Sequence, residues 1–245
     1  MSNVNGLKKF KDFFENYPDN YVIIGGTACS IIFEEVGENF RTTKDIDLVV
    51  IVECMEAGFG NRLWDFIKSA QYDIECGVEK RNFYRFRNPK VPNYPYMIEL
   101  FSRFEGLLLH ENQHIIPIHI AQEASSLSAI LLDDDYYNLL KEGKKIVDGL
   151  SVLDERYLIP FKAKAWCELV ERRKLGETGQ SRHILKHCRD VSNLVKLLPA
   201  NIKVSLKGKV REDMEIFVNH ILDGEFVPNG IDVQRLHDIL VSIYL

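Results

Sequence analysis

The stretch VIIGGTACSIIFEEVGENFRTTKDIDLVV, residues 22–50, decides the fold. It starts in a short β-rich run, YVII at 21–24, which is followed at once by Gly25 and Gly26. The next residues, ACSIIFEEV at 28–36, have helical character, and Thr27 is placed to cap that helix. We therefore expect a strand, a glycine turn and a helix in direct succession.

A second strand is predicted over DIDLVVIV, residues 45–52. The segment is dense in β-branched residues, and its second half is apolar on both faces, which is typical of a central strand. Successive side chains of a strand point to opposite faces, so Asp45 and Asp47 lie on the same face. Two neighbouring carboxylates repel each other unless a cation compensates them, and Mg²⁺ (or Mn²⁺) prefers such hard oxygen ligands. The aspartate pair therefore predicts a metal site.

The glycine turn predicts a phosphate site beside this metal site. Glycine lets the backbone approach a ligand, and the first N–H groups of a helix attract anions. Gly25, Gly26 and Thr27 thus suit a nucleoside triphosphate. Two-metal phosphoryl chemistry uses a further carboxylate. Glu99 in MIELF is the candidate, because an acid among apolar strand residues needs a metal or another cation as partner.

The hydrophobic periodicity of the remaining sequence differs between two parts of the chain, which we expect to be two domains, 1–150 and 151–245. The second domain is predicted to be helical. In the first, we expect helices at 7–17 and 61–70, strands at 82–88 and 96–103, and an edge strand at 115–120, where Pro117 removes a ladder donor.

Composition indicates an ordinary globular protein. The chain has 245 residues, 46% of them hydrophobic, and five cysteines, an odd number without a C-x-x-C pair, which argues against a disulfide framework or a cysteine zinc site. We find neither a secretory leader pattern nor an apolar run of membrane-spanning length. We therefore expect a cytoplasmic protein with no membrane partner.

Charge is distributed unevenly along the chain. The sequence holds 31 Lys+Arg against 36 Asp+Glu, a net charge of -5, yet residues 156–211 contain 14 basic and 4 acidic residues. Such a basic segment in an acidic chain suits a polyanion, either a triphosphate or RNA. The alternative explanation is a set of solvated helix faces.

Two motifs resemble the nucleotidyltransferase superfamily, and in particular its AbiEii/AbiGii toxin-like branch. The first is G-G-[ST] before a helix, and the second is R-x-T-x-D-I-D; here they read Gly25-Gly26-Thr27 and Arg41-Thr42-Thr43-Lys44-Asp45-Ile46-Asp47. The resemblance covers most of the chain and implies an α+β fold, with a nucleotidyltransferase-like mixed β-sheet flanked by helices and followed by a helical C-terminal region. It also implies that the turn, with Arg41 and Thr43, binds the nucleotide, and that Asp45, Asp47 and Glu99 hold Mg²⁺.

Two later helices carry further motifs of this branch. FKAKAW matches K-x-x-A through Lys162, which the resemblance implies to be catalytic and to face the phosphates, with Lys164 as the alternative. HCRDVSNL matches [K/R]-D-x-x-D-L through Arg189-Asp190, with Asn193 in place of the second acid. Asp190 would orient Lys162 or a substrate hydroxyl. An exposed lysine and an intrahelical partner of Lys186 are the ordinary alternatives for these two residues.

These motifs together predict a metal-dependent nucleotidyltransferase that moves a nucleoside monophosphate from a nucleoside triphosphate to an acceptor hydroxyl. The sequence does not distinguish between tRNA, a protein and a small molecule as the acceptor. The toxin-like resemblance adds a cognate antitoxin as a possible partner. One alternative is a non-catalytic module that binds nucleotide or RNA. Another is a zinc hydrolase that uses H-E-x-x-H, His110-Glu111-x-x-His114. Pro117 and the β-like residues around it argue against the helix that this motif needs.

Overall fold

The computed structural model describes residues 4–51, 53, 57–77, 83–103, 116–118, 130–131 and 133–245. The chain forms two compact units. The sheet unit consists of Met1–Leu132 and Leu140–Asp154, and the helical unit consists of Asp133–Leu139 and Glu155–Leu245. Helix α5 (Asp134–Glu142) contains the point where the chain passes from one unit to the other.

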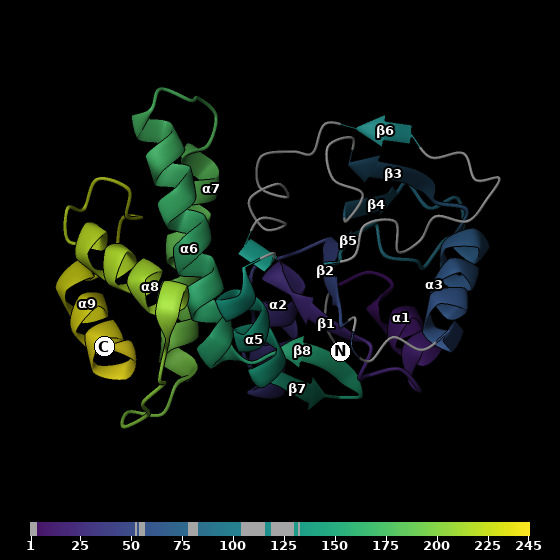
Figure 1. Cartoon of the computed structure of the whole chain (residues 1–245), viewed down its shortest axis with the longest axis horizontal. Helices are drawn as coiled ribbons and strands as arrows, with labels where there is room; N and C mark the ends of the chain where they lie inside the picture. Colours follow the sequence, from purple (N-terminus) through teal and green to yellow (C-terminus); the bar gives the residue numbers. More distant parts are fainter. Residues whose placement is uncertain are drawn as a thin grey trace. The chain divides into compact units, whose positions relative to one another are not determined.

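The sheet unit is built on a mixed sheet, as we predicted (Figure 1). Within the described residues it has eight strands in the order β6-β3-β4-β5-β2-β1-β8-β7. The strands are β1 (Tyr21–Ile24), β2 (Asp45–Val50), β3 (Asp73–Gly77), β4 (Phe83–Arg87), β5 (Met97–Phe101), β6 (Ile116–Ile118), β7 (Lys144–Val147) and β8 (Leu150–Leu153). Parallel pairing joins β1 to β8 and β2 to β5. The pairs β1–β2, β3–β4, β4–β5 and β7–β8 are antiparallel.

The predicted positions of two strands in the sheet are confirmed. Strand β2 lies between β1 and β5, so it is central, and its apolar second half, Leu48–Val50, is buried. Strand β6 lies at one end of the sheet and contains Pro117. An edge strand tolerates this proline because only one side of the strand needs ladder hydrogen bonds.

Three strands were absent from our prediction. The sequence of β3, DIECG, contains residues that are depleted in strands. Strands β7 and β8 form a hairpin that starts before residue 150, where we predicted a domain boundary, and ends at Leu153. Its turn residues Asp148 and Gly149 have φ 47 and φ 74, the conformation that an Asp-Gly hairpin turn requires.

Aromatic packing forms the core of the sheet unit. Helices α1 (Leu7–Phe14) and α3 (Ala57–Ala70) lie side by side (Figure 1). Phe66 of α3 is fully buried, and its ring centroid lies 5.8 Å from that of Phe10 and 5.4 Å from that of Phe14 on α1. Phe10 in turn packs edge-on against Tyr21 of β1, at 5.5 Å. This cluster fixes α1 and α3 against the strand that leads into the glycine turn.

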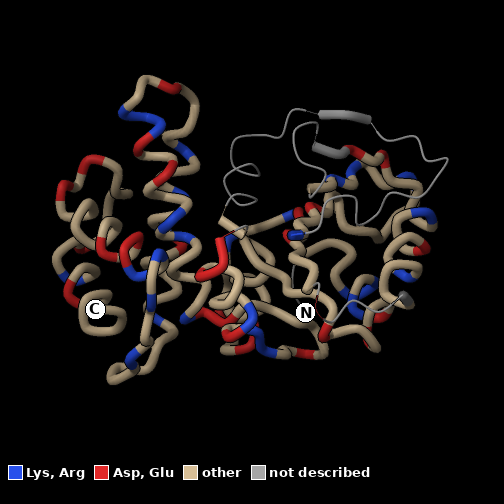
Figure 2. Tube along the Cα trace, viewed as in Figure 1, with Lys and Arg blue, Asp and Glu red and all other residues tan. Residues whose placement is uncertain are grey.

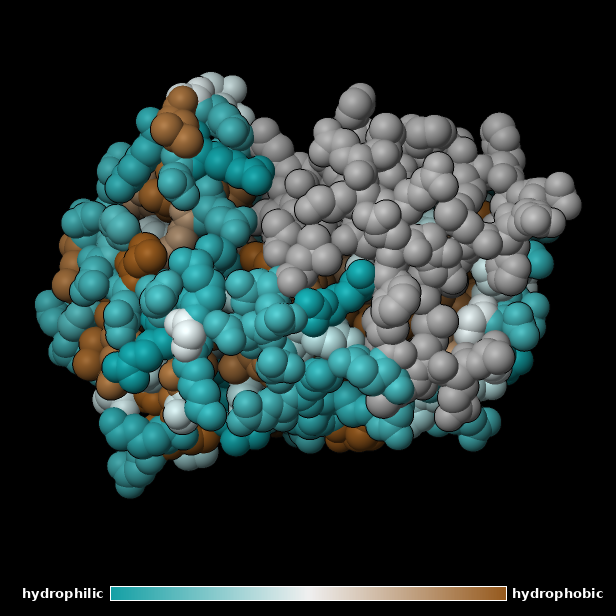
Figure 3. All heavy atoms as spheres, viewed as in Figure 1, coloured by the Kyte–Doolittle hydropathy of each residue, from teal (hydrophilic) through white to brown (hydrophobic). Residues whose placement is uncertain are grey.

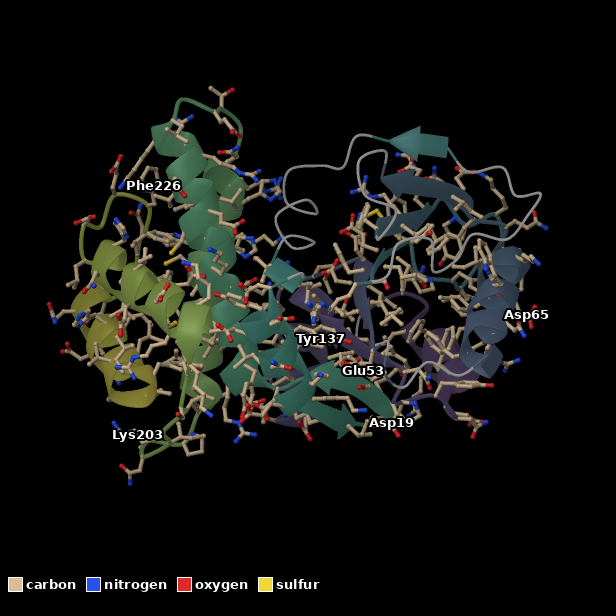
Figure 4. All side chains as sticks on the ribbon, viewed as in Figure 1. Asp19, Glu53, Asp65, Tyr137, Lys203 and Phe226 are labelled. Carbon is tan, nitrogen blue, oxygen red and sulfur yellow. The ribbon has the colours of Figure 1, made fainter. Side chains whose placement is uncertain are left out.

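The helical unit contains the helices that we predicted for the C-terminal region. They are α6 (Glu155–Lys174), α7 (Ser181–Leu194), a short 3-10 helix (Val195–Leu197), α8 (Gly208–Ile221) and α9 (Val233–Tyr244). Trp166 of α6 is buried and packs edge-on against Phe217 of α8, with ring centroids 5.1 Å apart. Its indole N–H donates to the carbonyl oxygen of Phe226, labelled in Figure 4, at 3.3 Å. The large ring thus packs α6 on α8 with its polar atom satisfied.

The face of the helical unit seen in Figure 3 is mainly hydrophilic, with hydrophobic residues scattered over it. Leu175, just after α6, is 79% exposed. Among the described residues, no helix is long and apolar enough to cross a membrane.

Replacing Phe66 by alanine tests the aromatic cluster. We expect Phe66→Ala to lower the free energy of unfolding by about 3–5 kcal/mol, because it opens a cavity among rings that cannot collapse into it. Chemical denaturation measures the change. Tyr96→Ala, at a side chain that is 53% exposed, is the control and should change stability by less than about 0.5 kcal/mol. Equal effects of the two substitutions would contradict the assignment of the cluster as core.

Candidate functional site

Strand β1 is followed directly by α2 (Gly25–Glu35), and the two glycines of the predicted turn are the first two residues of this helix. Gly25 has φ 69, a conformation that other residues rarely adopt. Ile24, the last residue of β1, is in register with Asp47 of the antiparallel neighbour β2. The turn therefore occurs beside the D-x-D motif.

Close approach explains why both residues of the turn are glycine. A Cβ atom on Gly25 would overlap Oδ2 of Asp47, so the carboxylate occupies the space of a side chain. A Cβ atom on Gly26 would lie 3.0 Å from Oγ1 of Thr43 and 3.3 Å from a guanidinium nitrogen of Arg41. Residues of both motifs that carry the family resemblance are thus brought together at one place.

Thr27 does not cap α2, contrary to our expectation. The helix starts at Gly25, and the buried hydroxyl of Thr27 instead donates to the carbonyl oxygen of Asp45 at 2.6 Å. This bond ties the first turn of α2 to the start of β2. The side chain of Thr27 holds the two elements together, while Gly25 and Gly26 allow the close approach of neighbouring side chains to the backbone.

The sheet places Asp45, Asp47 and Glu99 on one face. Asp45 and Asp47 alternate along β2 with the buried Ile46 and Leu48. Strand β5 runs parallel to β2, and Glu99 is directly in register with Asp47. Because residues paired across neighbouring strands share a face, Glu99 points to the same side as the aspartates.

Arg85 of β4 is a residue of this face that our sequence analysis missed. It is in register with Glu99, and its Nε and Nη2 donate to Oε1 of Glu99 at 2.9 and 2.6 Å. We expected a metal or a cation partner for Glu99, and the structure provides a cation from the chain itself. The strand pattern FYRFR contained the signal, since Arg85 alternates with Tyr84 and Phe86.

The donor atoms on this face are carboxylate oxygens, the ligands that hard divalent cations prefer. No group of three or more His, Cys, Asp or Glu residues that could hold a metal ion occurs within the part of the chain that the structure describes. Asp45 and Asp47 are the candidate ligands, and Glu99 adjoins them while its Oε1 accepts from Arg85.

In the helical unit, Lys162 and Asp190 form an ion pair. Nζ of Lys162 lies 3.1 Å from Oδ2 of Asp190, and the two side chains are only 6% and 1% exposed. Lys162 comes from α6 and Asp190 from α7, so the pair joins two helices. The exposed-lysine alternative for Lys162 is therefore wrong.

Lys164, our alternative phosphate lysine, belongs to a different cluster of the helical unit. Its Nζ lies 3.1 Å from Oδ2 of Asp213 on α8 and 3.6 Å from Oε1 of Glu168. The hydroxyl of Tyr136 donates to the same Asp213 oxygen at 3.2 Å, and burial next to Asp213 raises the pKa of this tyrosine. Burial also raises the pKa of Glu168. These contacts bind Lys164 into the packing of α5, α6 and α8.

Two thiols of the helical unit are poor nucleophiles. Burial raises the pKa of Cys167 and of Cys188 to about 12. Both thiols are therefore protonated at neutral pH, and only the thiolate is a good nucleophile. The H-E-x-x-H motif at residues 110–114 lies outside the described residues.

Comparison with known proteins leaves the family undetermined. No family model matches the chain, and no curated protein matches it. Among solved structures, the crystal structure of JHP933 from Helicobacter pylori is similar to this chain with 11% sequence identity and a TM-score of 0.33. The match covers 96% of this chain and 85% of that chain. A likeness of this strength carries no argument about fold or function.

Gly25→Ala tests the close approach at the turn. We expect it to lower the free energy of unfolding by more than about 1 kcal/mol, because alanine is strained at φ 69 and its methyl group displaces the Asp47 carboxylate. Gly60→Ala in α3 is the matched control, since a Cβ atom there meets nothing within 4 Å. In that variant the free energy of unfolding should rise by about 0.5–1 kcal/mol, because alanine has a higher helix propensity than glycine. Two variants of equal stability in urea denaturation would contradict the geometry of the turn.

Proposed function

We propose that the chain is a metal-dependent nucleotidyltransferase that resembles the AbiEii/AbiGii toxin-like branch. The reaction would transfer a nucleoside monophosphate from a nucleoside triphosphate to an acceptor hydroxyl, with release of pyrophosphate. One observation carries the proposal: Gly25 and Asp47, which belong to separate motifs, approach so closely that a side chain on Gly25 would overlap the carboxylate. A phosphate cradle and a pair of metal ligands at one place match what this chemistry requires.

The turn would bind the triphosphate through its backbone. Gly25 and Gly26 present N–H groups at the start of α2, where the helix dipole favours an anion. The Arg41 guanidinium and the Thr43 hydroxyl lie next to Gly26, where they would contact phosphate oxygens. The absence of a side chain at Gly26 leaves room for these two groups beside the backbone.

Asp45 and Asp47 would hold Mg²⁺ or Mn²⁺, with Glu99 beside them. When bound, the cation neutralises phosphate charge and polarises the bond to the leaving group. The chain's own residues would contribute by holding the triphosphate in line with the acceptor hydroxyl and by fixing the charges around it. In the helical unit, Lys162, the catalytic lysine that the family resemblance implies, is held by Asp190.

A non-catalytic nucleotide-binding module is the second candidate. The observation in its favour is the ion pair of Glu99 with Arg85, because an arginine already compensates the carboxylate that we expected to bind metal. Dependence of turnover on Mg²⁺ distinguishes the two functions. Incubation of the protein with each α-phosphate-labelled nucleoside triphosphate and a cell extract, with and without Mg²⁺, would detect transfer and its acceptor.

Asp47→Asn tests the enzyme assignment directly. The substitution removes one charge at nearly constant volume, so we expect transfer to fall by more than about 100-fold while the protein stays folded. Asp65→Asn makes the same chemical change on the exposed face of α3 (Figure 4) and should retain wild-type activity. Label transfer in the screen above provides the measurement. A folded Asp47→Asn protein with wild-type turnover would refute the assignment.

The surface of α7 indicates the chemistry of the acceptor. Arg182, Lys186 and Arg189 lie on one face of the helix at spacings of four and three residues, and Figure 2 shows basic residues along α6 and α7. None of the three forms a salt bridge with any residue that the structure describes. The acid of α7, Asp190, is buried. The exposed charged residues of α7 are therefore all basic, which favours a polyanionic acceptor such as tRNA.

Replacing these three α7 residues by glutamine tests the acceptor class. Binding of total tRNA should weaken, and the slope of log affinity against log salt should fall by about 2–3, since each phosphate contact releases counterions. A variant with Lys8, Lys68 and Lys207 replaced by glutamine loses the same charge elsewhere and should bind like wild type. Electrophoretic mobility shift over a salt series measures both. If the two triple variants bind tRNA equally well, the acceptor is a protein or a small molecule.

A further inference from the structure

A row of charged residues crosses four strands of the sheet unit. Asp47 of β2 is in register with Glu99 of β5, Glu99 with Arg85 of β4, and Arg85 with Glu75 of β3. Residues in direct register share a face and are near enough to interact. The candidate metal site thus lies at one end of a row of charged side chains, in which the Arg85 guanidinium stands between two carboxylates.

Arg85 lies at the centre of this row and contacts both neighbours. It donates twice to Oε1 of Glu99, and its Nη1 lies 3.8 Å from Oε2 of Glu75. Arg87 contacts the other oxygen of Glu75, with Nη2 2.5 Å from Oε1. The Glu75 side chain is 3% exposed, which makes it a fixed anchor on the far side of Arg85.

The charges of the two glutamates and two arginines balance before any cation binds, without counting Asp47. Glu75 and Glu99 carry two negative charges, and Arg85 and Arg87 carry two positive charges. A guanidinium is always protonated in proteins, so this compensation is permanent. The Arg85 charge is also adjacent to the candidate cation site, where it opposes the attraction of the carboxylates for a dication.

We infer that Arg85 is a positioning residue that fixes Glu99 beside Asp47 and lowers the affinity of the site for a divalent cation. This inference rests on the proposed function of the site. Arg85 orients the Glu99 carboxylate by a forked contact and cancels its charge, so the aspartate pair dominates cation binding. Weak binding of a free cation favours its arrival together with the triphosphate, whose charge then adds to that of the aspartates.

Binding of Mn²⁺ to the full-length protein without nucleotide tests this role. Arg85→Gln removes the charge while retaining a hydrogen-bond donor for Glu99, and we expect Mn²⁺ to bind about tenfold more tightly. Arg85→Lys keeps the charge and should restore affinity close to that of wild type. The double variant Arg85→Gln/Glu99→Gln has the same net charge as wild type, and its affinity should return to the wild-type range. Electron paramagnetic resonance titration measures free Mn²⁺ directly.

Arg87→Gln is the matched control, because it removes the same charge from the same strand without touching Glu99. Its Mn²⁺ affinity should change by less than about twofold. Circular dichroism would verify folding, and Arg85→Met replaces the glutamine variant if that variant does not fold. A folded single variant that lacks the Arg85 charge, Arg85→Gln or Arg85→Met, overturns the role of Arg85 if it binds Mn²⁺ no more tightly than wild type or than Arg87→Gln. Wild-type Mn²⁺ binding that is insensitive to Asp47→Asn would instead overturn the proposed function itself.

Discussion

The pairing of β1 with β2 is the constraint on which the rest of the site depends. Strand β1 ends at Ile24, opposite Asp47, and the chain turns there into α2 without a loop. The space in which a side chain at position 25 would lie is filled by the Asp47 carboxylate, so this turn requires glycine. The hydroxyl of Thr27 then fastens α2 to β2. One strand pair therefore sets the turn, the start of the helix and the carboxylate face.

Elements that are encoded locally were predictable, whereas those that depend on distant partners were not. Strand β2 is a continuous β-branched run, and its central position follows from its apolar second half. Strand β3 has no such pattern, and its pairing with β4, where Glu75 faces Arg85, overrides its low propensity. The hairpin of β7 and β8 did carry a local signal, Asp148-Gly149, which a stricter search for two-residue turns would have found.

The same distinction holds for the candidate functional residues of each unit. The residue types at Asp45, Asp47, Glu99 and Lys162 could be selected from sequence, because each combines a chemical group with a predicted element. Their ionic partners could not. Arg85 lies 14 residues from Glu99 along the chain, and Lys162 and Asp190 lie on separate helices, so register and helix packing decide which charges meet. Sequence patterns identify the groups, but only the fold identifies what compensates them.

In each unit, a charged side chain that we propose to be functional is held in place by a side chain of opposite charge. Arg85 holds Glu99 at 2.6 Å in the sheet unit, and Asp190 holds Lys162 at 3.1 Å in the helical unit. Burying ion pairs is a poor way to stabilise a protein, because desolvation offsets much of their attraction. A side chain held in this way has little rotamer freedom left to lose when a ligand binds, so it is preorganised. Each pair also weakens the field that its functional member presents to a ligand. For the triphosphate chemistry that we propose, this exchange would be favourable, since transfer depends on accurately placed charges and a triphosphate would bring further charge of its own.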